Sequence, residues 1–512
     1  MSSRQPTALP IRDWQQLLAL RQLLGQRWLA VGLALACTGL AATTTVLLFK
    51  LGIDALGSWR IRLLEQGPAW LVLPAVGLSG GLVAGLLISG LAPAAGGSGI
   101  TQVMLFLRRR GVPIGLRIAL VKLVAGIAAI GSGFPLGPSG PSIQMGSSMG
   151  WSLARLLRAP PAFVRVIVAA GGGAGIAAVF NAPIGGFFYA MEALLRGGRP
   201  VVMLIVLAVT FWADIWADLL GLAGMGVDAT ALVGSGELQL KRSLDVYVQV
   251  LPIDLLLLFG LGGLVALVAE SYCRFLLRLQ SLSSRWRQPL ALKLGLAGAL
   301  LGLADALLPQ AFVNEAGVRL AVASGEIDVA MALGVAVVLF LSTGLAAAVG
   351  APGGLFAPML TLGGALGLVA VELVELSGIH APDTAVFAGM GAFLSATART
   401  PITALFLVFA LSKQWLLLKP VLSACLGSVL VARLLARDSL FERLLRLTGD
   451  AETTQPPGLG EPGPLRPNAL PLRPRAAQGA PASASPVNRC GETLEGDRIR
   501  PDATAEPGNP AV

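Results

Sequence analysis

Three clusters rich in Gly, Ser and Pro have the composition of backbone anion sites. They occupy residues 97–101, 137–142 and 353–358, and each precedes a short helical segment. The first N–H groups of a helix lack intrahelical acceptors and carry partial positive charge, so they can bind an anion. If the three starts meet inside a membrane, they predict a site that releases ions quickly, because partial charges hold an ion less tightly than a full charge. The alternative is that these residues serve only turns and close helix packing.

The composition predicts an all-α, polytopic membrane protein. The chain has 512 residues, of which 55% are hydrophobic and 13% charged, and its mean hydropathy is +0.75. Soluble globular chains carry about a quarter charged residues, so a cytosolic or disordered protein is excluded. The net charge of +10 is interpreted as topology and attraction to lipid headgroups. No basic cluster is interleaved with aromatics, so we expect no nucleic-acid partner.

The apolar runs that could supply membrane spans differ in length. A span needs about 20 apolar residues. The candidate runs lie at 28–52, 68–91, 115–131, 160–180, 200–222, 249–273, 289–307, 329–348, 360–377 and 416–435. Shorter helical pieces are expected near 98–107, 140–156, 184–195 and 400–411. Broken helices of this kind place irregular backbone around a polar cavity in transporters and channels.

An internal duplication joins two distant parts of the chain. Residues 170–188 match residues 388–406 at a spacing of 218, including the pairs Gly171/Gly389 and Pro183/Pro401. At a spacing of 217, four residues pair in order: Gly137, Pro141, Gly146 and Gly150 with Gly354, Pro358, Gly363 and Gly367. The ordered pairing across adjacent segments predicts a duplicated, transporter-like fold. Hydropathy alone leaves open whether the halves are parallel or inverted.

We divide the chain into three predicted parts. Residues 1–27 lack the pattern of a signal peptide and form an expected cytoplasmic segment. Residues 28–447 form the membrane domain, with repeats at about 28–222 and 249–447. Residues 448–512 form a predicted disordered tail, because twelve of the chain's 33 prolines fall in the last 62 residues.

Four sequence elements resemble the CLC family of chloride channels and proton-coupled chloride exchangers. They are GSGIT at 97–101, GSGFPLGPSGPSIQMG at 131–146, FNAPIGG at 180–186 and GAPGGLFAPM at 350–359. The resemblance extends from about residue 27 to 447 and implies inverted helical repeats. It also implies a homodimer in which each subunit has its own anion pathway, lined by helix N-termini.

Carried over by motif, the resemblance implies an anion site. Its expected residues are Ser98, Gly99, Ser139, Gly140, Leu355, Phe356 and Phe441. Lys122 matches a basic residue of the family. A lysine inside the membrane is costly, so we expect it to pair or to add positive potential near the pathway.

Three departures from the family pattern bear on the mechanism. Most members carry a gating and proton-accepting glutamate at the position of Ser139, and exchangers carry a proton-relay glutamate at that of Ala193. Neither serine nor alanine can ionise near neutral pH. Glu192 is interpreted as structural, with a displaced proton path as the alternative. Phe441 stands where the family has an anion-binding tyrosine hydroxyl, so we expect a weaker central site.

These departures predict a passive, uncoupled chloride channel of CLC type. The alternatives are a slow chloride/proton antiporter with a non-standard proton path, and a non-transporting membrane scaffold. An enzyme is not expected, because the sequence has no nucleophile–base pair, metal-ligand pattern or nucleotide loop. No cofactor is implied. The expected partners are chloride and other small monovalent anions, the lipid bilayer and a second copy of the chain.

We expect an integral, multi-pass location in a prokaryotic inner membrane, with a thylakoid or organelle membrane as the alternative.

Overall fold

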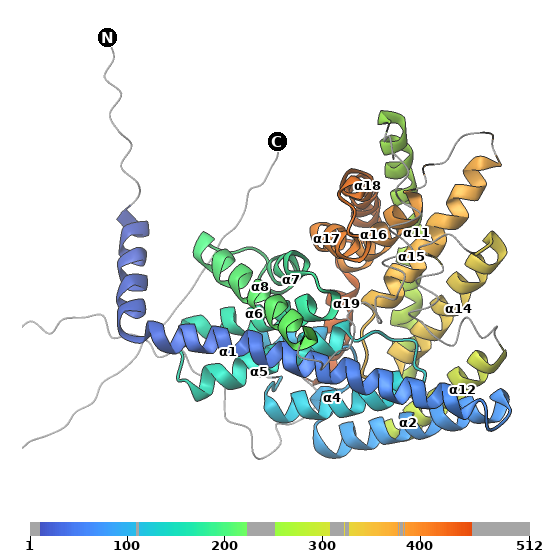
Figure 1. The fold of residues 1–512 in the computed structure, drawn as a ribbon, viewed down its shortest axis with the longest axis horizontal. Coiled ribbons are helices and arrows are strands. Elements are labelled where there is room, and N and C mark those ends of the chain that lie inside the picture. Colours follow the sequence, from blue (N-terminus) through green and yellow to red (C-terminus); the bar gives the residue numbers. More distant parts are fainter. Residues whose placement is uncertain are drawn as a thin grey trace, which may run out of the picture. The chain divides into compact units, whose positions relative to one another are not determined.

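The computed structural model describes residues 11–108, 112–222, 251–307, 322, 327–376, 378, 382 and 384–452, and these residues fold as helices connected by short loops (Figure 1). The first half of the chain contains α1 (Ile11–Leu63), α2 (Ala69–Leu91), η1 (Pro93–Ala95), α3 (Ile100–Leu107), α4 (Leu116–Gly131), α5 (Ser139–Leu156), α6 (Pro161–Phe180), α7 (Pro183–Tyr189), η2 (Ala190–Leu195) and α8 (Pro200–Leu222). The second half contains α11 (Pro252–Arg285), α12 (Leu290–Leu307), α14 (Val329–Ala348), α15 (Phe356–Glu375), α16 (Ala385–Ala398), α17 (Pro401–Ser412), η4 (Trp415–Leu417), α18 (Leu418–Leu435) and α19 (Leu440–Glu452). The predicted all-α class is confirmed.

Nine helical segments within the described ranges are long and apolar enough to cross a membrane. Between them lie shorter helices, including α3, α7 and α17, which are too short to cross alone. The predicted mixture of long spans and short pieces is present, but the predicted span at 115–131 forms α4, which has only 16 residues and is not among the nine.

The structure describes the predicted N-terminal and C-terminal segments only in part. Helix α1 begins at Ile11, inside the predicted N-terminal segment, and α19 ends at Glu452, a few residues into the predicted tail. Residues 1–10 and 453–512 lie outside the described part of the chain. A cytoplasmic N-terminus and a disordered tail therefore stay predictions.

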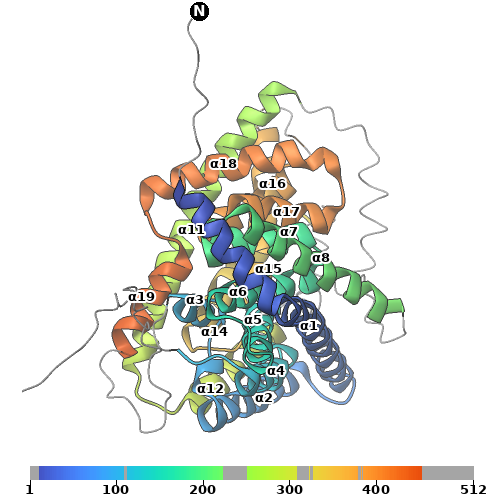
Figure 2. The same ribbon diagram turned by 90° about the vertical axis from the view of Figure 1, so that its left-hand side faces the viewer.

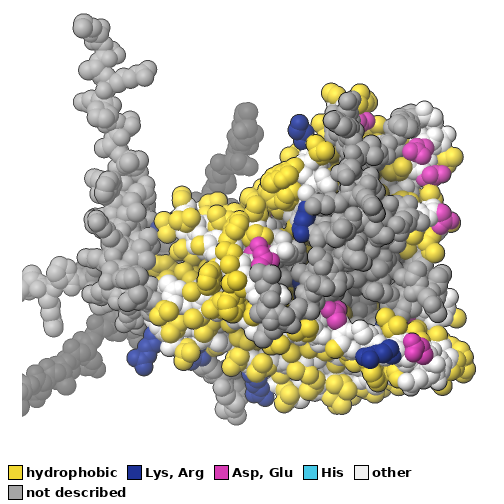
Figure 3. Space-filling model, viewed as in Figure 1, with side chains coloured by type: hydrophobic (Ala, Val, Ile, Leu, Met, Phe, Trp, Pro, Cys, Tyr) yellow, Lys and Arg dark blue, Asp and Glu magenta, His cyan; other side chains and the backbone are white. Residues whose placement is uncertain are grey.

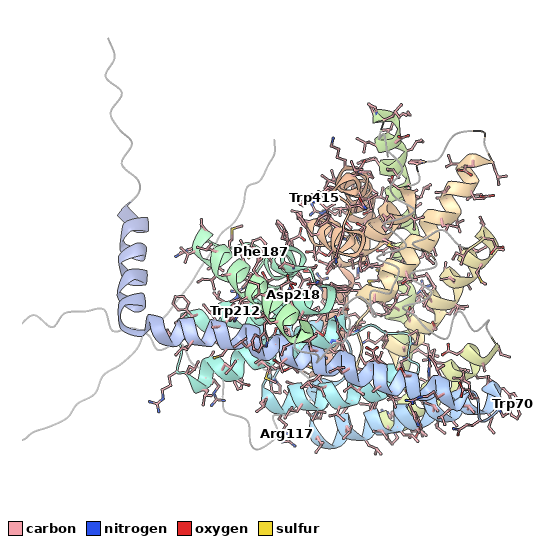
Figure 4. All side chains as sticks on the ribbon, in the orientation of Figure 1. Trp70, Arg117, Phe187, Trp212, Asp218 and Trp415 are labelled. Atoms are coloured by element: carbon pink, nitrogen blue, oxygen red, sulfur yellow. The ribbon has the colours of Figure 1, made fainter. Side chains whose placement is uncertain are left out.

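The outer surface of the described helices is apolar, as lipid contact requires. Hydrophobic side chains cover most of the described surface in Figure 3, with charged groups in a few separate places. Leu86, Leu204 and Leu434 are among the large apolar residues that face outward. Trp70, at the start of α2, and Trp415, in η4, are exposed near helix ends (Figure 4), where indole rings favour the membrane–water interface. The chain is an integral, multi-pass membrane protein.

The duplication seen in the sequence is repeated in the packing. Helix α5 packs on α6 through Gly146 and Gly171, and α15 packs on α16 through their equivalents Gly363 and Gly389. A Cβ added to Gly146 would lie 2.2 Å from the carbonyl oxygen of Gly171. The same addition to Gly363 would lie 2.3 Å from that of Gly389. Only glycine permits such close helix contact, which explains why these pairs recur.

Each repeat then makes the same turn into a short helix. The residues that follow α6 and α16, Asn181 (φ 49°) and Arg399 (φ 60°), both lie in the left-handed region. Pro183 and Pro401 begin α7 and α17, where proline needs no N–H and fixes a helical φ. The rings of Phe188 and Phe406, which are also repeat equivalents, stack at 5.1 Å.

An antiparallel bridge joins the two repeats at equivalent residues. The Gly137 N–H donates to the Gly354 carbonyl at 2.8 Å, and the Gly354 N–H donates to the Gly137 carbonyl at 2.7 Å. Reciprocal pairing of equivalent residues is what a local two-fold axis between repeats produces, as expected for inverted halves. Helices α5 and α15 therefore start next to each other.

Candidate anion site

The three Gly/Ser/Pro clusters meet at one place in the molecule. Figure 2 shows α3, α5 and α15 near the centre of the helices. A Cβ added to Gly140, at the start of α5, would lie 2.2 Å from the Ser98 carbonyl oxygen and 2.9 Å from the Gly354 Cα. The loop before α3, the first turn of α5 and the loop before α15 are therefore in direct contact. The convergence predicted from the sequence is present.

The Ser98 loop is fixed by its backbone conformation and by a hydrogen bond to the second repeat. Gly97 and Gly99 adopt φ values of 67° and 88°, which strain any other residue. The Gly97 N–H donates to the Gly350 carbonyl at 2.9 Å. This loop directs the chain into α3, which begins at Ile100.

Lys122 of α4 is fully buried beneath the Ser98 loop. Its Nζ donates to the carbonyl oxygens of Ala95 at 2.9 Å and Gly97 at 2.5 Å. Both acceptors are neutral carbonyls, so the lysine pairs with the loop and positions it. A positive potential near the pathway stays a prediction.

Ser139 is the first residue of α5 and is fully buried. Its hydroxyl has no hydrogen-bond partner among the described residues. Gln144, one turn later, donates to the Ala94 carbonyl at 2.7 Å, and its own side-chain oxygen likewise lacks a described partner. Buried polar groups are nearly always paired, so unpaired ones at a helix start identify a place where a polar species can bind.

Leu355 and Phe356 begin α15 beside Ser139 and are buried. Their N–H groups belong to the first turn, which has no intrahelical acceptors. The Phe356 ring packs edge-on against two other aromatic rings: the centroid of Tyr189 lies 5.5 Å away and that of Phe441 lies 5.9 Å away. The predicted residues Phe356 and Phe441 are therefore in contact.

A cavity of about 360 Å³ opens on the other side of these rings. Tyr189 and Phe441 form part of its wall, together with Glu192 and Ala193. The charged groups on its wall are four arginines and three carboxylates: Arg196, Arg399, Arg433, Arg437, Glu192, Asp438 and Glu442. The cavity therefore carries an excess of positive charge next to the aromatic cluster.

Glu192 stabilises the start of α17, which lies 210 residues later in the chain. Its Oε1 accepts from the Ile402 N–H at 3.2 Å, and its Oε2 accepts from the N–H and hydroxyl of Thr403 at 2.9 and 2.6 Å. A carboxylate at a helix N-terminus is favourable, because it satisfies free N–H groups and complements the macrodipole. The side chain thus has a structural role. Glu192 and Ala193 both lie in the π-helical turn η2, a feature common at functional sites.

A family model described as voltage gated chloride channel matches residues 80–433, which include the three loops and most of both repeats. The chain belongs to the CLC family. The resemblance inferred from the motifs is therefore confirmed, and the chain is an anion transporter of this family in the broad sense.

Named relatives of this CLC protein include bacterial exchangers. It is 31% identical over 417 residues to the H(+)/Cl(-) exchange transporter ClcA of Yersinia pseudotuberculosis, covering 78% of this chain and 84% of the relative. The ClcA protein of Cronobacter sakazakii is 29% identical over 464 residues, covering 88% and 96%.

Among solved structures, a slow cyanobacterial Cl-/H+ antiporter superposes with a TM-score of 0.73 at 26% identity. The match covers 83% of this chain and 99% of that one. A eukaryotic CLC transporter superposes with a TM-score of 0.68 at 19% identity, covering 82% and 74%, and so supports the fold alone.

Reasoning from the sequence missed two features of this CLC site. Tyr189 belongs to the aromatic cluster, and Gln144 fastens α5 to the loop that follows α2. Tyr189 is one of only three tyrosines in the chain and follows the FNAPIGG element within a few residues. Its position near this element could have identified Tyr189 as a candidate site residue. The sequence does not show where its hydroxyl points.

Proposed function

We propose that this CLC protein is a passive channel for chloride and other small monovalent anions, uncoupled from protons. The observation that carries the proposal is Ser139. It lies fully buried at the start of α5, next to the loop before α15, and has no ionisable group near neutral pH. A serine can neither occupy the pathway as an anion mimic nor accept a proton from it.

The cavity side supports the same conclusion. Ala193 contributes only a methyl group to the wall. The three carboxylates that line the cavity within the described ranges are all engaged. Glu192 caps α17, Asp438 pairs with Arg446 at 2.5 Å, and Glu442 accepts from Arg108, Arg196 and Ser439. Their oxygens are therefore already used as acceptors for these donors.

Three groups of residues form the proposed pathway. Ser98 and Gly99 contribute from the α3 side, Ser139 and Gly140 from α5, and Leu355 and Phe356 from α15, with Phe441 at the cavity. Lys122 raises the local potential. We expect a homodimer in a prokaryotic inner membrane, with thylakoid or organelle membranes as the alternative, and no cofactor.

The second candidate is a slow chloride/proton antiporter. Its support is the relatives, since both named bacterial proteins and the cyanobacterial structure are exchangers by name. Such a protein would need a proton path through Glu192 or through water. A non-transporting scaffold is the third candidate, and robust anion flux would exclude it.

The deciding experiment is chloride efflux from liposomes that contain the purified protein, with external pH recorded. We expect fast efflux when valinomycin shunts the charge, without stoichiometric proton movement. Proton uptake that a chloride gradient drives uphill would contradict the channel and support the antiporter. If the protein is an antiporter and Glu192 carries the proton, Glu192→Gln should abolish proton movement. If it is a channel, Glu192→Gln should leave the anion flux uncoupled from protons.

A further inference from the structure

Tyr189 is held rigidly at the boundary between the cavity and the anion site. It is the last residue of α7, and its side chain is only 1% exposed. Its ring packs edge-on at 78° against Phe356, whose own N–H belongs to the free first turn of α15. Phe441 packs on the same Phe356 ring. The three rings therefore form one cluster where the cavity approaches the helix start.

The Tyr189 hydroxyl is buried, yet it has no hydrogen-bond partner among the described residues. The other buried tyrosine of known surroundings behaves differently, because the hydroxyls of Tyr272 and Thr343 lie 3.0 Å apart and pair. A buried phenol without a protein partner is uncommon and calls for a ligand. Tyr189 is also one of the residues that line the cavity of about 360 Å³.

The surroundings favour an anion over a cation as that ligand. The cavity wall carries four arginines against three carboxylates, and each of those carboxylates is already hydrogen-bonded. A phenol can donate to an anion together with helix N-terminal N–H groups, as it does in anion-stabilising sites. Phe441, which packs on the same Phe356 ring and lines the same cavity, has a ring but no donor.

We propose that the Tyr189 hydroxyl donates a hydrogen bond to the permeating anion at the cavity side of Phe356. It thereby supplies, from α7, the side-chain donor that Phe441 does not provide from α19. The inference rests on the proposed anion pathway, but it is independent of whether that pathway is coupled to protons.

The test is chloride binding to the purified full-length protein, measured by calorimetry on wild type and Tyr189→Phe. The substitution keeps the ring and removes only the hydroxyl. Losing a hydrogen bond to a charged ligand should raise the chloride Kd about tenfold. Tyr272→Phe is the matched control, since it also removes one buried hydroxyl but lies away from the cavity, and its chloride Kd should equal that of wild type.

Thermal unfolding separates binding from folding. Without chloride, Tyr189→Phe should unfold at the wild-type midpoint or above, because its hydroxyl has no described protein partner. Tyr272→Phe should unfold lower, because it loses the bond to Thr343. Adding chloride should stabilise Tyr189→Phe less than the other two proteins. A second substitution, Phe441→Tyr, should restore chloride affinity in the Tyr189→Phe background by presenting a hydroxyl from α19 beside the same Phe356 ring.

Equal chloride affinity in Tyr189→Phe, Tyr272→Phe and wild type would overturn this inference alone, because the hydroxyl would then make no bond to the anion. Wild-type protein with no chloride binding by either method would overturn both the inference and the proposed function. If wild type shows proton-coupled chloride flux and Tyr189→Phe binds chloride more weakly, the channel proposal would be overturned and the role of Tyr189 supported.

Discussion

The two repeats share a backbone plan but present different side chains to the site. In both repeats, a helix (α5 or α15) starts next to the central bridge and crosses the following helix (α6 or α16) at a Gly–Gly contact. That second helix is followed by a left-handed residue and then by a short helix that begins with proline. In the first repeat, α5 buries polar residues: Ser139, Ser142, Gln144, Ser147 and Ser148. The corresponding turns of α15 bury Phe356, Met359, Leu360 and Leu362, and their buried Thr361 hydroxyl bonds its own helix at Ala357.

This difference separates what a repeat must keep from what it can change. Glycine contacts and turns set where the helix N-termini point, and both repeats retain them. The side chains that follow each N-terminus set which chemistry the site has. One repeat therefore offers hydroxyl and amide groups, and the other offers an apolar wall with free backbone N–H groups.

Replacing a glycine at one of the Gly–Gly helix contacts should disrupt the helix packing that both repeats share. In Gly146→Val, a Cβ 2.2 Å from the Gly171 carbonyl forces α5 and α6 apart. We expect a loss of about 3 kcal/mol or more, enough to prevent recovery of folded protein. Gly363→Val should do the same, because its Cβ would lie 2.3 Å from the Gly389 carbonyl. The measurement is the yield and thermal midpoint of the purified protein.

The matched control is Gly260→Val in the membrane helix α11, where a Cβ would meet no atom within 4 Å. It should fold like wild type. If Gly146→Val folded as well as Gly260→Val, the close crossing would not be a requirement of the repeat.

Adding a carboxylate at the start of α5 should reduce anion flux without changing how the helices of the repeat pack. In Ser139→Glu, the tethered carboxylate competes with chloride for the N–H groups at the helix starts. One charge-assisted interaction corresponds to about a tenfold or larger reduction in flux at neutral pH. Protonation releases the carboxylate, and the ordinary glutamate pKa is about 4.3, so flux should recover as the pH falls toward that value.

Ser139→Gln serves as the control, because it has the size of glutamate without the charge. Its flux should not depend on pH in this way. Identical flux in Ser139→Glu and wild type at neutral pH would place the anion pathway away from the start of α5.

The smallest expected effect concerns the loop before α3, which contains Ser98. This loop belongs to neither α5 nor α15. Ser98→Ala removes a hydroxyl beside the contact with Gly140. We expect a loss of about 1 kcal/mol in discrimination of chloride from nitrate, or about fivefold, measured by efflux with each anion. Ser79→Ala on α2 is the control, since that hydroxyl only bonds its own helix. Unaltered selectivity would mean that other groups hold the anion.

Much of the fold could be predicted from the sequence because its determinants are local. Apolar runs define the long helices, and Pro183 and Pro401 define two helix starts. The spacing of 217 between Gly137 and Gly354 predicted that they are equivalent, and the structure pairs them directly. The three helix starts were likewise identifiable from their Gly, Ser and Pro content.

The partners of individual side chains could not be predicted in the same way. Glu192 caps α17 through Ile402, which lies 210 residues later, and Lys122 binds carbonyls of the loop before α3, more than 20 residues earlier in the chain. The unpaired hydroxyl of Tyr189 is defined only by what surrounds it.

The sequence by itself determined the membrane class, the duplication and the identity of the residues at each helix start, because these follow from hydropathy and backbone preference. Only the tertiary structure decided that the starts of α3, α5 and α15 converge and that Glu192 accepts hydrogen bonds from the first turn of α17. It also decided that Tyr189 packs with Phe356 and Phe441 at the cavity. The physical reason is that such contacts join residues far apart in the chain, and close packing of the whole membrane domain selects them.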